Sequence, residues 1–283
     1  MKIRRRDLFF SFLIVLLLWQ VFSWLLNRPI LPSPLTVLLV FWRDFIGGLS
    51  LAEQIVSDPG ILKRPLALLV TLWQDLTGGT TLLNHFLVSL WRVLAGTALA
   101  ILTAAPAGLA LGQSKRFNRL FAPLIYLLYP VPKVVFIPII LLFLGIGDTS
   151  KIFIIFIILF FQILVLVRDQ AANLRPELIQ SVRSLGAGRR ALFRFVYLPA
   201  SLPAILTALR QSVGTAVAVL YIAETIATTR GLGYYISFQG TTLFNYPAMY
   251  AGVVAMSLLG LGMYFSVDWL ERRICPWMTP EAS

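Results

Sequence analysis

The chain has 283 residues, of which 58% are hydrophobic and only 13% are charged. Because a soluble domain usually carries about 25% charged residues, this composition excludes an ordinary soluble protein and indicates an integral membrane protein. The net charge of +12 would favour a nucleic-acid partner in a soluble chain. In a membrane protein, however, topogenic charge and attraction to anionic headgroups account for such an excess. We therefore expect contact with membrane lipid and no nucleic-acid binding.

The first predicted element is an apolar helix over residues 8–26, preceded by a basic head that contains Lys2 and Arg4. This arrangement resembles a secretory signal peptide, but the apolar stretch is too long for one and no small-x-small cleavage site follows it. We therefore interpret residues 1–27 as a retained signal anchor.

Residues 28–82 contain an internal duplication. The stretches PLTVLLVFWRDFIGG (Pro34 to Gly48) and PLALLVTLWQDLTGG (Pro65 to Gly79) align at a period of 31 residues, with seven identical positions. Each begins at a proline and ends at Gly-Gly, which is typical of a short amphipathic helix. We expect these helices to lie along the outer headgroups; the alternatives are a partner-docking role and an extra re-entrant hairpin.

Six apolar stretches are long enough to cross a bilayer, since a span needs roughly 20 apolar residues. They cover residues 8–26, 83–112, 120–144, 150–167, 197–226 and 247–267. If both ends of the chain lie inside, the short outside loops hold only Lys151 and Arg230. The inside segments then hold Lys2, Arg4, Arg5, Arg6, Lys115, Arg116, Arg119, Arg168, Arg175, Arg183, Arg189, Arg190, Arg194, Arg272 and Arg273. Lysine and arginine near span ends mark the cytoplasmic side, so we predict six spans with both termini in the cytoplasm.

The third stretch is interrupted by four prolines, with Lys133 among them, in the sequence YPVPKVVFIP. An internal proline removes a backbone hydrogen bond and kinks or breaks a helix, which a membrane tolerates only where the freed groups meet protein or water. The sequence therefore predicts a broken helix whose segment YPVPKVVFIP does not face lipid. Both a transport pathway and a purely structural kink fit this pattern.

Four ionisable residues within the predicted spans are Arg92, Lys133, Arg210 and Glu224. Because a charge at the bilayer centre costs roughly 2.5–3.5 kcal/mol, each should face the bundle interior, a water path or the interface. Arg92 and Glu224 lie at similar depth, so an ion pair between them is possible. Arg210 lies too deep for easy snorkelling, which makes it a candidate for the path. Three cations against one carboxylate predict a weakly basic path and hence a small anionic solute.

Motifs of catalysis are missing from the sequence. There is no G-x-x-x-x-G-K-[ST] loop, and GLGYY (Gly231 to Tyr235) lacks the third glycine of a dinucleotide site. The single histidine, His85, has no Cys, Asp or Glu at metal-ligand spacing. The single cysteine, Cys275, can form no internal disulfide. We expect no enzymatic activity, and no metal or cofactor bound to this chain.

A basic segment, residues 168–199, lies between the fourth and fifth predicted spans. From Gln180 it reads Q-S-V-x(3)-G-x(9)-V-x-L-P. A short helix from Pro176 to about Leu185, stopped by a glycine and followed by a second basic helix, fits this spacing. A short surface helix of this kind can dock into a groove on a soluble partner and pass motion to the spans.

This spacing resembles the E-A-A-x(3)-G-x(9)-I-x-L-P signature of binding-protein-dependent ABC transporter permeases. Further stretches are similar to the nitrate, taurine, alkanesulfonate and bicarbonate branch of these permeases: LPSP, SLWRVLAG, YPVPKVVFIPIILLFLGIG, SLGAGRR, LPASLPAILTALRQSVG and AETIATTRGLGYYI. Two features depart from the branch. Gln180-Ser181-Val182 replaces Glu-Ala-Ala, although Glu177 lies three residues earlier, and residues 28–82 form a longer outer segment than expected.

The resemblance implies an all-α polytopic fold of the MetI-like permease type in a bacterial inner membrane. It would have six transmembrane helices, amphipathic periplasmic helices and a cytoplasmic coupling helix. The permease core would cover residues 83–267 and a cytoplasmic tail residues 268–283. The implied partners are a nucleotide-binding ATPase subunit, which would hold ATP and magnesium, a second permease copy, and an extracytoplasmic solute-binding protein.

The resemblance also assigns roles to particular residues. The coupling helix, which would dock on the ATPase, would comprise Pro176, Glu177, Leu178, Gln180, Ser181, Val182, Leu185 and Gly186. Weaker candidates for the translocation path or its gate are Arg92, Lys133, Arg210 and Glu224. The expected function is import of a small anionic solute such as nitrate, a sulfonate, taurine or bicarbonate. The alternatives are import of a vitamin precursor such as a pyrimidine, and an ATP-independent carrier or channel.

Overall fold

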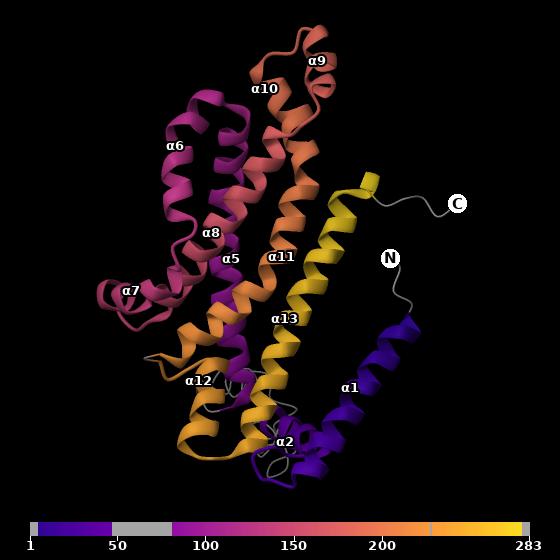
Figure 1. The fold of residues 1–283 in the computed structure, drawn as a ribbon, viewed down its shortest axis with the longest axis vertical. Coiled ribbons are helices and arrows are strands. Elements are labelled where there is room, and N and C mark those ends of the chain that lie inside the picture. Colours follow the sequence, from indigo (N-terminus) through magenta and orange to yellow (C-terminus); the bar gives the residue numbers. More distant parts are fainter. Residues whose placement is uncertain (1–4, 47–80, 227, 279–283) are drawn as a thin grey trace, which may run out of the picture. The chain divides into compact units, whose positions relative to one another are not determined.

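The structure is a computed structural model that describes residues 5–46, 81–226 and 228–278, and within these ranges it contains helices and no strand (Figure 1). The all-α prediction is therefore confirmed. The chain divides into two compact units. The first comprises Met1–Ser89 and Glu224–Leu258, and the second comprises Leu90–Ala223 and Leu259–Ser283. The boundaries of these units differ from the predicted domain boundaries, which stay predictions.

The first unit contains two N-terminal helices joined by a tight corner. Helix α1 (Arg5–Leu26) is followed by α2 (Pro34–Ile46), which begins at the predicted proline. The indole of Trp19 donates to the carbonyl of Pro32 (3.1 Å), and the Ser23 hydroxyl donates to the carbonyl of Leu31 (2.9 Å). These bonds satisfy backbone acceptors of the connection. The first copy of the duplication is thus a helix, as predicted, while the second copy (Pro65 to Gly79) lies outside the described residues.

Short helices also belong to the first unit. Helix α12 (Leu232–Ser237) and the π-turn η4 (Phe238–Thr242) precede α13 (Tyr246–Ile274), whose first part lies in this unit. The Tyr235 hydroxyl donates to Asp44 of α2 at 2.8 Å. Burial, reinforced by the charge of Asp44, raises the pKa of the Tyr235 hydroxyl. The phenol therefore keeps its proton and holds α2 against α12.

The second unit is built on a close pairing of α5 (Leu82–Gln113) with α8 (Asp148–Ala172). Small residues recur at every fourth position of α5, on one face: Gly96, Ala100, Ala104, Gly108 and Gly112. A Cβ added at any of these three glycines would come within 3.0 Å of α8 atoms. This is the small-residue ridge by which membrane helices approach backbone to backbone.

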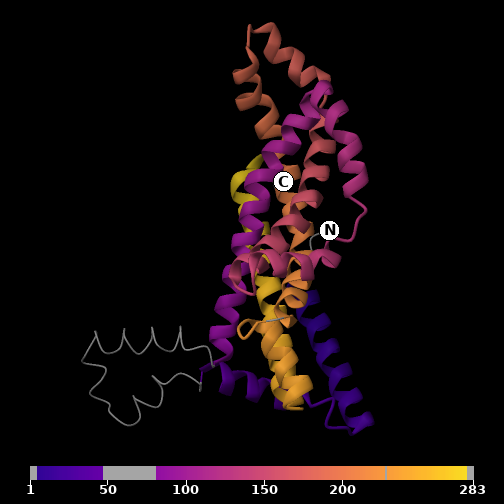
Figure 2. The ribbon, with the colours of Figure 1, turned by 90° about the vertical axis from the view of Figure 1, so that its left-hand side faces the viewer.

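The third predicted span is broken, as the prolines predict. Helix α6 (Lys115–Leu128) is followed by the 3-10 turn η2 (Lys133–Phe136) and by α7 (Ile137–Leu144). The two halves meet at a bend of 77° (Figure 2). Ser114 is the N-cap of α6, because its hydroxyl accepts a hydrogen bond from the Phe117 amide at 3.4 Å.

The remaining predicted spans coincide with long helices. Helix α11 (Leu198–Thr225) continues without a break from α10 (Arg189–Leu192) and the π-turn η3 (Phe193–Tyr197). The chain ends in the 3-10 turn η5 (Pro276–Met278). Four described helices are long and apolar enough to cross a membrane, or five if the bent pair counts as one span. The first predicted span is a helix, but its described apolar part, Phe10–Leu26, is shorter than these. The count of six is therefore confirmed only in part.

Candidate functional site

A helical hairpin of the second unit carries the predicted docking surface. Helix α9 (Pro176–Ser184) and α10 project beyond the ends of α5 and α8 in both views (Figures 1 and 2). Pro176 takes the first helical position, where the missing amide hydrogen costs nothing. Gly186 follows with φ +80°, a left-handed value that favours glycine and ends the helix. The predicted short helix and glycine stop are confirmed; the predicted role in docking is not tested by the geometry.

No side chain of α9 is buried. Leu178 is 46% exposed and Leu185, just after the helix, is 85% exposed. With Val182, these residues recur at intervals of four and three and so share one face of the helix. All eight predicted docking residues lie on this helix or at its end, but Glu177 and Gln180 lie off the apolar face. An exposed apolar stripe on a short projecting helix is a surface suited to a protein partner.

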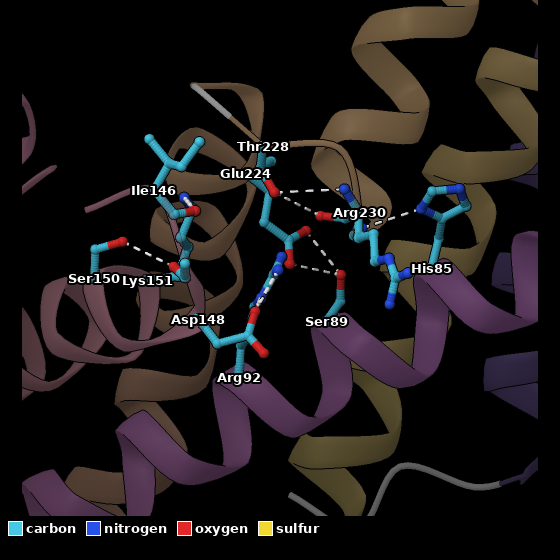
Figure 3. A network of polar contacts seen from close by, with 12 residues as sticks. His85, Ser89, Arg92, Ile146, Asp148, Ser150, Lys151, Glu224, Thr228 and Arg230 are labelled. Carbon is cyan, nitrogen blue, oxygen red and sulfur yellow. Dashed lines mark hydrogen bonds and ion pairs between the residues drawn. The ribbon is translucent and has the colours of Figure 1, made fainter. Parts of the chain in front are cut away.

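A buried carboxylate organises the polar cluster of the first unit (Figure 3). Glu224 is 0% exposed. Its two oxygens accept hydrogen bonds from the Ser89 hydroxyl at 2.9 and 2.7 Å, and Oε2 also accepts from the Gly233 amide at 3.0 Å. The Ser89 oxygen in turn accepts from the Leu232 amide at 2.7 Å. A buried charge is tolerated when such donors surround it.

The same cluster fixes the turn that leads into α12. The Gly231 amide donates to Nδ1 of His85 at 3.0 Å. His85 therefore accepts with Nδ1, and its neutral ring carries the proton on Nε2. Sequence reasoning had placed Glu224 among candidate path residues and had excluded His85 as a metal ligand. It missed that His85 and Ser89, one helical turn apart on α5, accept hydrogen bonds from the amides of Gly231 and Leu232.

Arg92 lies on the part of α5 that belongs to the second unit. Its Nε and Nη2 donate to Oδ1 of Asp148 at 2.9 and 2.6 Å (Figure 3). Nearby on α8, the buried Lys151 donates to the carbonyl of Ile146, and the Ser150 hydroxyl donates to the carbonyl of Gly147 at 2.8 Å. These bonds anchor the start of α8 to α5 and to the turn before it. The predicted pair of Arg92 with Glu224 stays a prediction.

Lys133 donates hydrogen bonds to backbone carbonyl groups at the break that the prolines cause. Its ammonium group donates to the carbonyls of Leu128 and Tyr129 at the end of α6 and lies 4.8 Å from the ring centroid of Phe161. Terminal carbonyls of a helix lack intrahelical partners and carry partial negative charge, which a cation stabilises. This contact gives Lys133 a structural role at the break.

Arg210 pairs with carboxylates on α13 within the second unit. Its Nη1 lies 2.9 Å from Oε2 of Glu271 and 3.6 Å from Oδ1 of Asp268. The closer contact is an ion pair whose angles do not make a hydrogen bond, since Oε2 has no hydrogen-bond partner among the described residues. Arg272 also pairs with Asp268, at 2.7 Å. Arg210 therefore helps to hold α11 against α13.

These pairs correct the charge count behind the anionic-solute prediction. That count set three cations against one carboxylate, because Asp148, Asp268 and Glu271 fell outside the narrow apolar ranges assigned to the spans. The observed helices extend past those ranges and include all three. Two of the three cations thus have carboxylate partners, so these residues do not form the unpaired basic path on which the prediction rested. Among the described residues, no group of His, Cys, Asp and Glu could hold a metal ion.

Comparison with known proteins adds independent findings. A family model described as "Binding-protein-dependent transport system inner membrane component" matches residues 96–275. The chain is 34% identical to the taurine transport system permease protein TauC of Escherichia coli over 197 residues, 70% of this chain and 71% of that protein. It is 28% identical to the putative aliphatic sulfonates transport permease protein SsuC of the same bacterium, covering 93% and 88% of the two chains.

Two further similarities concern a pyrimidine permease and a solved structure. The chain is 25% identical to the formylaminopyrimidine transport permease protein ThiX of Halalkalibacterium halodurans, over 94% of this chain and 93% of that one. It also resembles a chain from the inward-facing MetNI methionine ABC transporter, with a TM-score of 0.61 and 19% identity, covering 68% of this chain and 95% of that one. This likeness shows the fold and confirms the predicted MetI-like permease type.

Proposed function

The chain belongs to the binding-protein-dependent transport system inner membrane component family and is thus the permease subunit of an ABC importer, and we propose that its solute is a small sulfonate such as taurine. The proposal rests on TauC and SsuC, two relatives whose names specify taurine and aliphatic sulfonates. The pyrimidine alternative rests on ThiX, which is less similar at 25% identity. The charges within the spans favour neither solute, because most of them are paired.

We further propose the arrangement of partners that this family membership implies. Two copies of the chain would enclose a central path, with both termini in the cytoplasm. A separate ATPase subunit would hold ATP and magnesium and carry out hydrolysis, so that the permease itself would catalyse no reaction. An extracytoplasmic binding protein would deliver the solute.

The observation that carries the mechanism is the exposed apolar stripe of α9. Leu178 and Leu185 would insert into a groove on the ATPase and become buried there, which stabilises the complex in proportion to the apolar area removed from water. Closure of the ATPase dimer on ATP would draw the two α9 helices together, and hydrolysis would release them. Because α10, the second arm of the hairpin, continues through η3 and α11 as one helix, a displacement of α9 would pass directly to a membrane span.

Copurification with the cognate ATPase tests the docking role. Leu178→Asp and Leu185→Asp each place a charge on the stripe, and we expect either to weaken ATPase retention by at least about tenfold. Leu243→Asp is the matched control, since Leu243 is similarly exposed at 52% but lies between α12 and α13, on the predicted outer side. Equal retention of the ATPase by all three variants would contradict the docking role.

Reconstitution in proteoliposomes tests the solute. With the ATPase and binding protein present, taurine and short alkanesulfonates should stimulate ATP hydrolysis and be taken up. Stimulation by a pyrimidine alone would instead favour the alternative. Uptake that persists without the ATPase would point to an ATP-independent carrier.

A further inference from the structure

An apolar groove in the second unit takes no part in the proposed coupling. It lies between α5, α6 and α8, has a volume of about 450 Å³, and is lined only by apolar side chains. They include Leu111, Phe117, Phe121, Leu124, Phe160 and Leu164. This volume falls within the roughly 300–1,000 Å³ of ligand pockets, and the absence of any polar lining group suits a hydrocarbon chain.

Helix α6 places positive charge at one end of this groove. Its lining residues, among them Phe117 and Phe121, recur at helical spacing and share a face. Its first turn and a half carries Lys115, Arg116 and Arg119, all of them exposed. By the positive-inside rule this end of α6 faces the cytoplasm, where the leaflet contains anionic lipid. The groove therefore runs from a basic rim toward the middle of the bilayer.

A further cation, the buried Arg168, lies beside the groove. Arg168 lies one turn beyond the lining residue Leu164, and its guanidinium stands 5.3 Å from the ring centroid of Tyr126, next to the lining residue Ile125. Nε and Nη2 of Arg168 bind Asp169, but its buried Nη1 has no hydrogen-bond partner among the described residues. Arg168 does not line the groove and is balanced by Asp169, so the three exposed cations of α6 carry the charge argument.

We propose that this groove binds the acyl chain of an anionic phospholipid of the cytoplasmic leaflet, with the headgroup phosphate on Lys115, Arg116 and Arg119. The positive charge at the rim of the groove favours this occupant over a second copy of the chain. Two copies packed symmetrically through this face would bring two sets of three cations together, which like-charge repulsion opposes. The inference goes beyond solute transport and requires neither the ATPase nor the solute.

Native mass spectrometry of the purified full chain tests the proposal with phosphatidylglycerol and phosphatidylcholine of identical acyl chains. We expect at least about tenfold tighter binding of phosphatidylglycerol, and loss of that preference in Lys115→Gln/Arg116→Gln/Arg119→Gln. The control Arg183→Gln/Arg190→Gln/Arg194→Gln removes the same charge from α9, α10 and η3 and should keep the preference. Equal binding of both lipids, or equal loss in both triple variants, would overturn the proposal.

A photoreactive phosphatidylglycerol with its label in the acyl chain localises the site on the unmodified protein. The cross-links should fall on the peptides of α6 and α8 that contain Phe121 and Phe160. Cross-links confined to other helices would overturn the assignment. So would efficient disulfide formation between two copies of a Phe121→Cys variant in native membranes, because a second copy would then occupy the groove.

Discussion

The carboxylate of Glu224 lies directly against the backbone of Gly231, seven residues further along the chain. Gly231 has φ +113°, which side-chain-bearing residues rarely adopt, and a Cβ at this position would overlap the Glu224 carboxylate. Since the adjacent amides of residues 231–233 donate to His85, Ser89 and Glu224, the turn needs glycine for two independent reasons. Glycine at position 231 is therefore a structural requirement of this polar cluster.

Replacing Gly231 should lower the stability of the folded chain. Gly231→Ala introduces both backbone strain and an overlap with a buried charge, and we expect a loss of about 2–4 kcal/mol in stability. Gly145→Ala is the matched control, because Gly145 also has positive φ (+74°) but a Cβ there meets nothing within 4 Å. Thermal unfolding in detergent measures both. A Gly231→Ala variant no less stable than Gly145→Ala would contradict the described overlap.

Overpacking of the ridge on α5 should also be measurable. A Cβ at Gly112 would lie 2.5 Å from the carbonyl oxygen of Arg168, a backbone atom that cannot swing away. Such overpacking costs about 1–3 kcal/mol, which outweighs the gain of up to about 1 kcal/mol for replacing a helical glycine by alanine. We expect Gly112→Ala to lower the unfolding temperature.

Gly262→Ala in α13 serves as the reference for that prediction, since a Cβ there meets nothing within 4 Å. It should leave the unfolding temperature unchanged or raise it slightly. Identical behaviour of the two variants would show that α5 and α8 are not in close contact at Gly112.

The sequence predicted the elements of this fold better than their contacts. Apolar runs and prolines located the helices and the break at Lys133, because these depend on local composition. The ridge from Gly96 to Gly112 is visible in the sequence as small residues at every fourth position, but no helix pairing was predicted from it. The partners of Arg92 and Arg210 were missed for another reason. Asp148 and Glu271 lie near helix ends beyond the apolar runs, and only the folded helices show that they contact these arginines.

The polar cluster around Glu224 could not have been predicted at all from spacing. Ser89 and Glu224 are 135 residues apart, and nothing in the local pattern of either links them. Both stretches had been noted for their resemblance to the same transporter branch, but a resemblance assigns neither hydrogen bonds nor distances. In contrast, helix α9 was predictable, because a proline start, a glycine stop and the length between them are local features.

The single cysteine offers a test of burial that depends on pH. Cys275 follows the end of α13 and is 1% exposed, and burial, together with the nearby charge of Glu271, raises the pKa of its thiol. Since only the thiolate reacts, alkylation of Cys275 should be slow at pH 7.5. It should still accelerate above pH 9, where an ordinary thiol with a pKa of about 8.5 approaches its limiting rate.

The control for this measurement is a Cys275→Ser chain that carries Ser184→Cys on the exposed hairpin. Its alkylation should be faster at pH 7.5 and should level off at lower pH than that of Cys275. Maleimide or iodoacetamide labelling followed by intact-mass measurement gives both rates. Matching pH profiles would show that Cys275 is accessible and titrates normally.

The ion pair between Arg210 and Glu271 allows a test of whether Arg210 packs helices or binds the solute. If the pair mainly holds α11 against α13, Arg210→Gln should lower stability by about 1 kcal/mol, equivalent to about 2–4 °C in unfolding temperature for a chain of this size. Arg210→Glu/Glu271→Arg should recover part of that loss, because the pair is restored in reverse. The concentration of solute for half-maximal uptake should change little in the double variant. If instead Arg210 contacts the solute, the charge swap would raise that concentration by at least about tenfold without restoring transport, and the assignment of Arg210 to helix packing would be wrong.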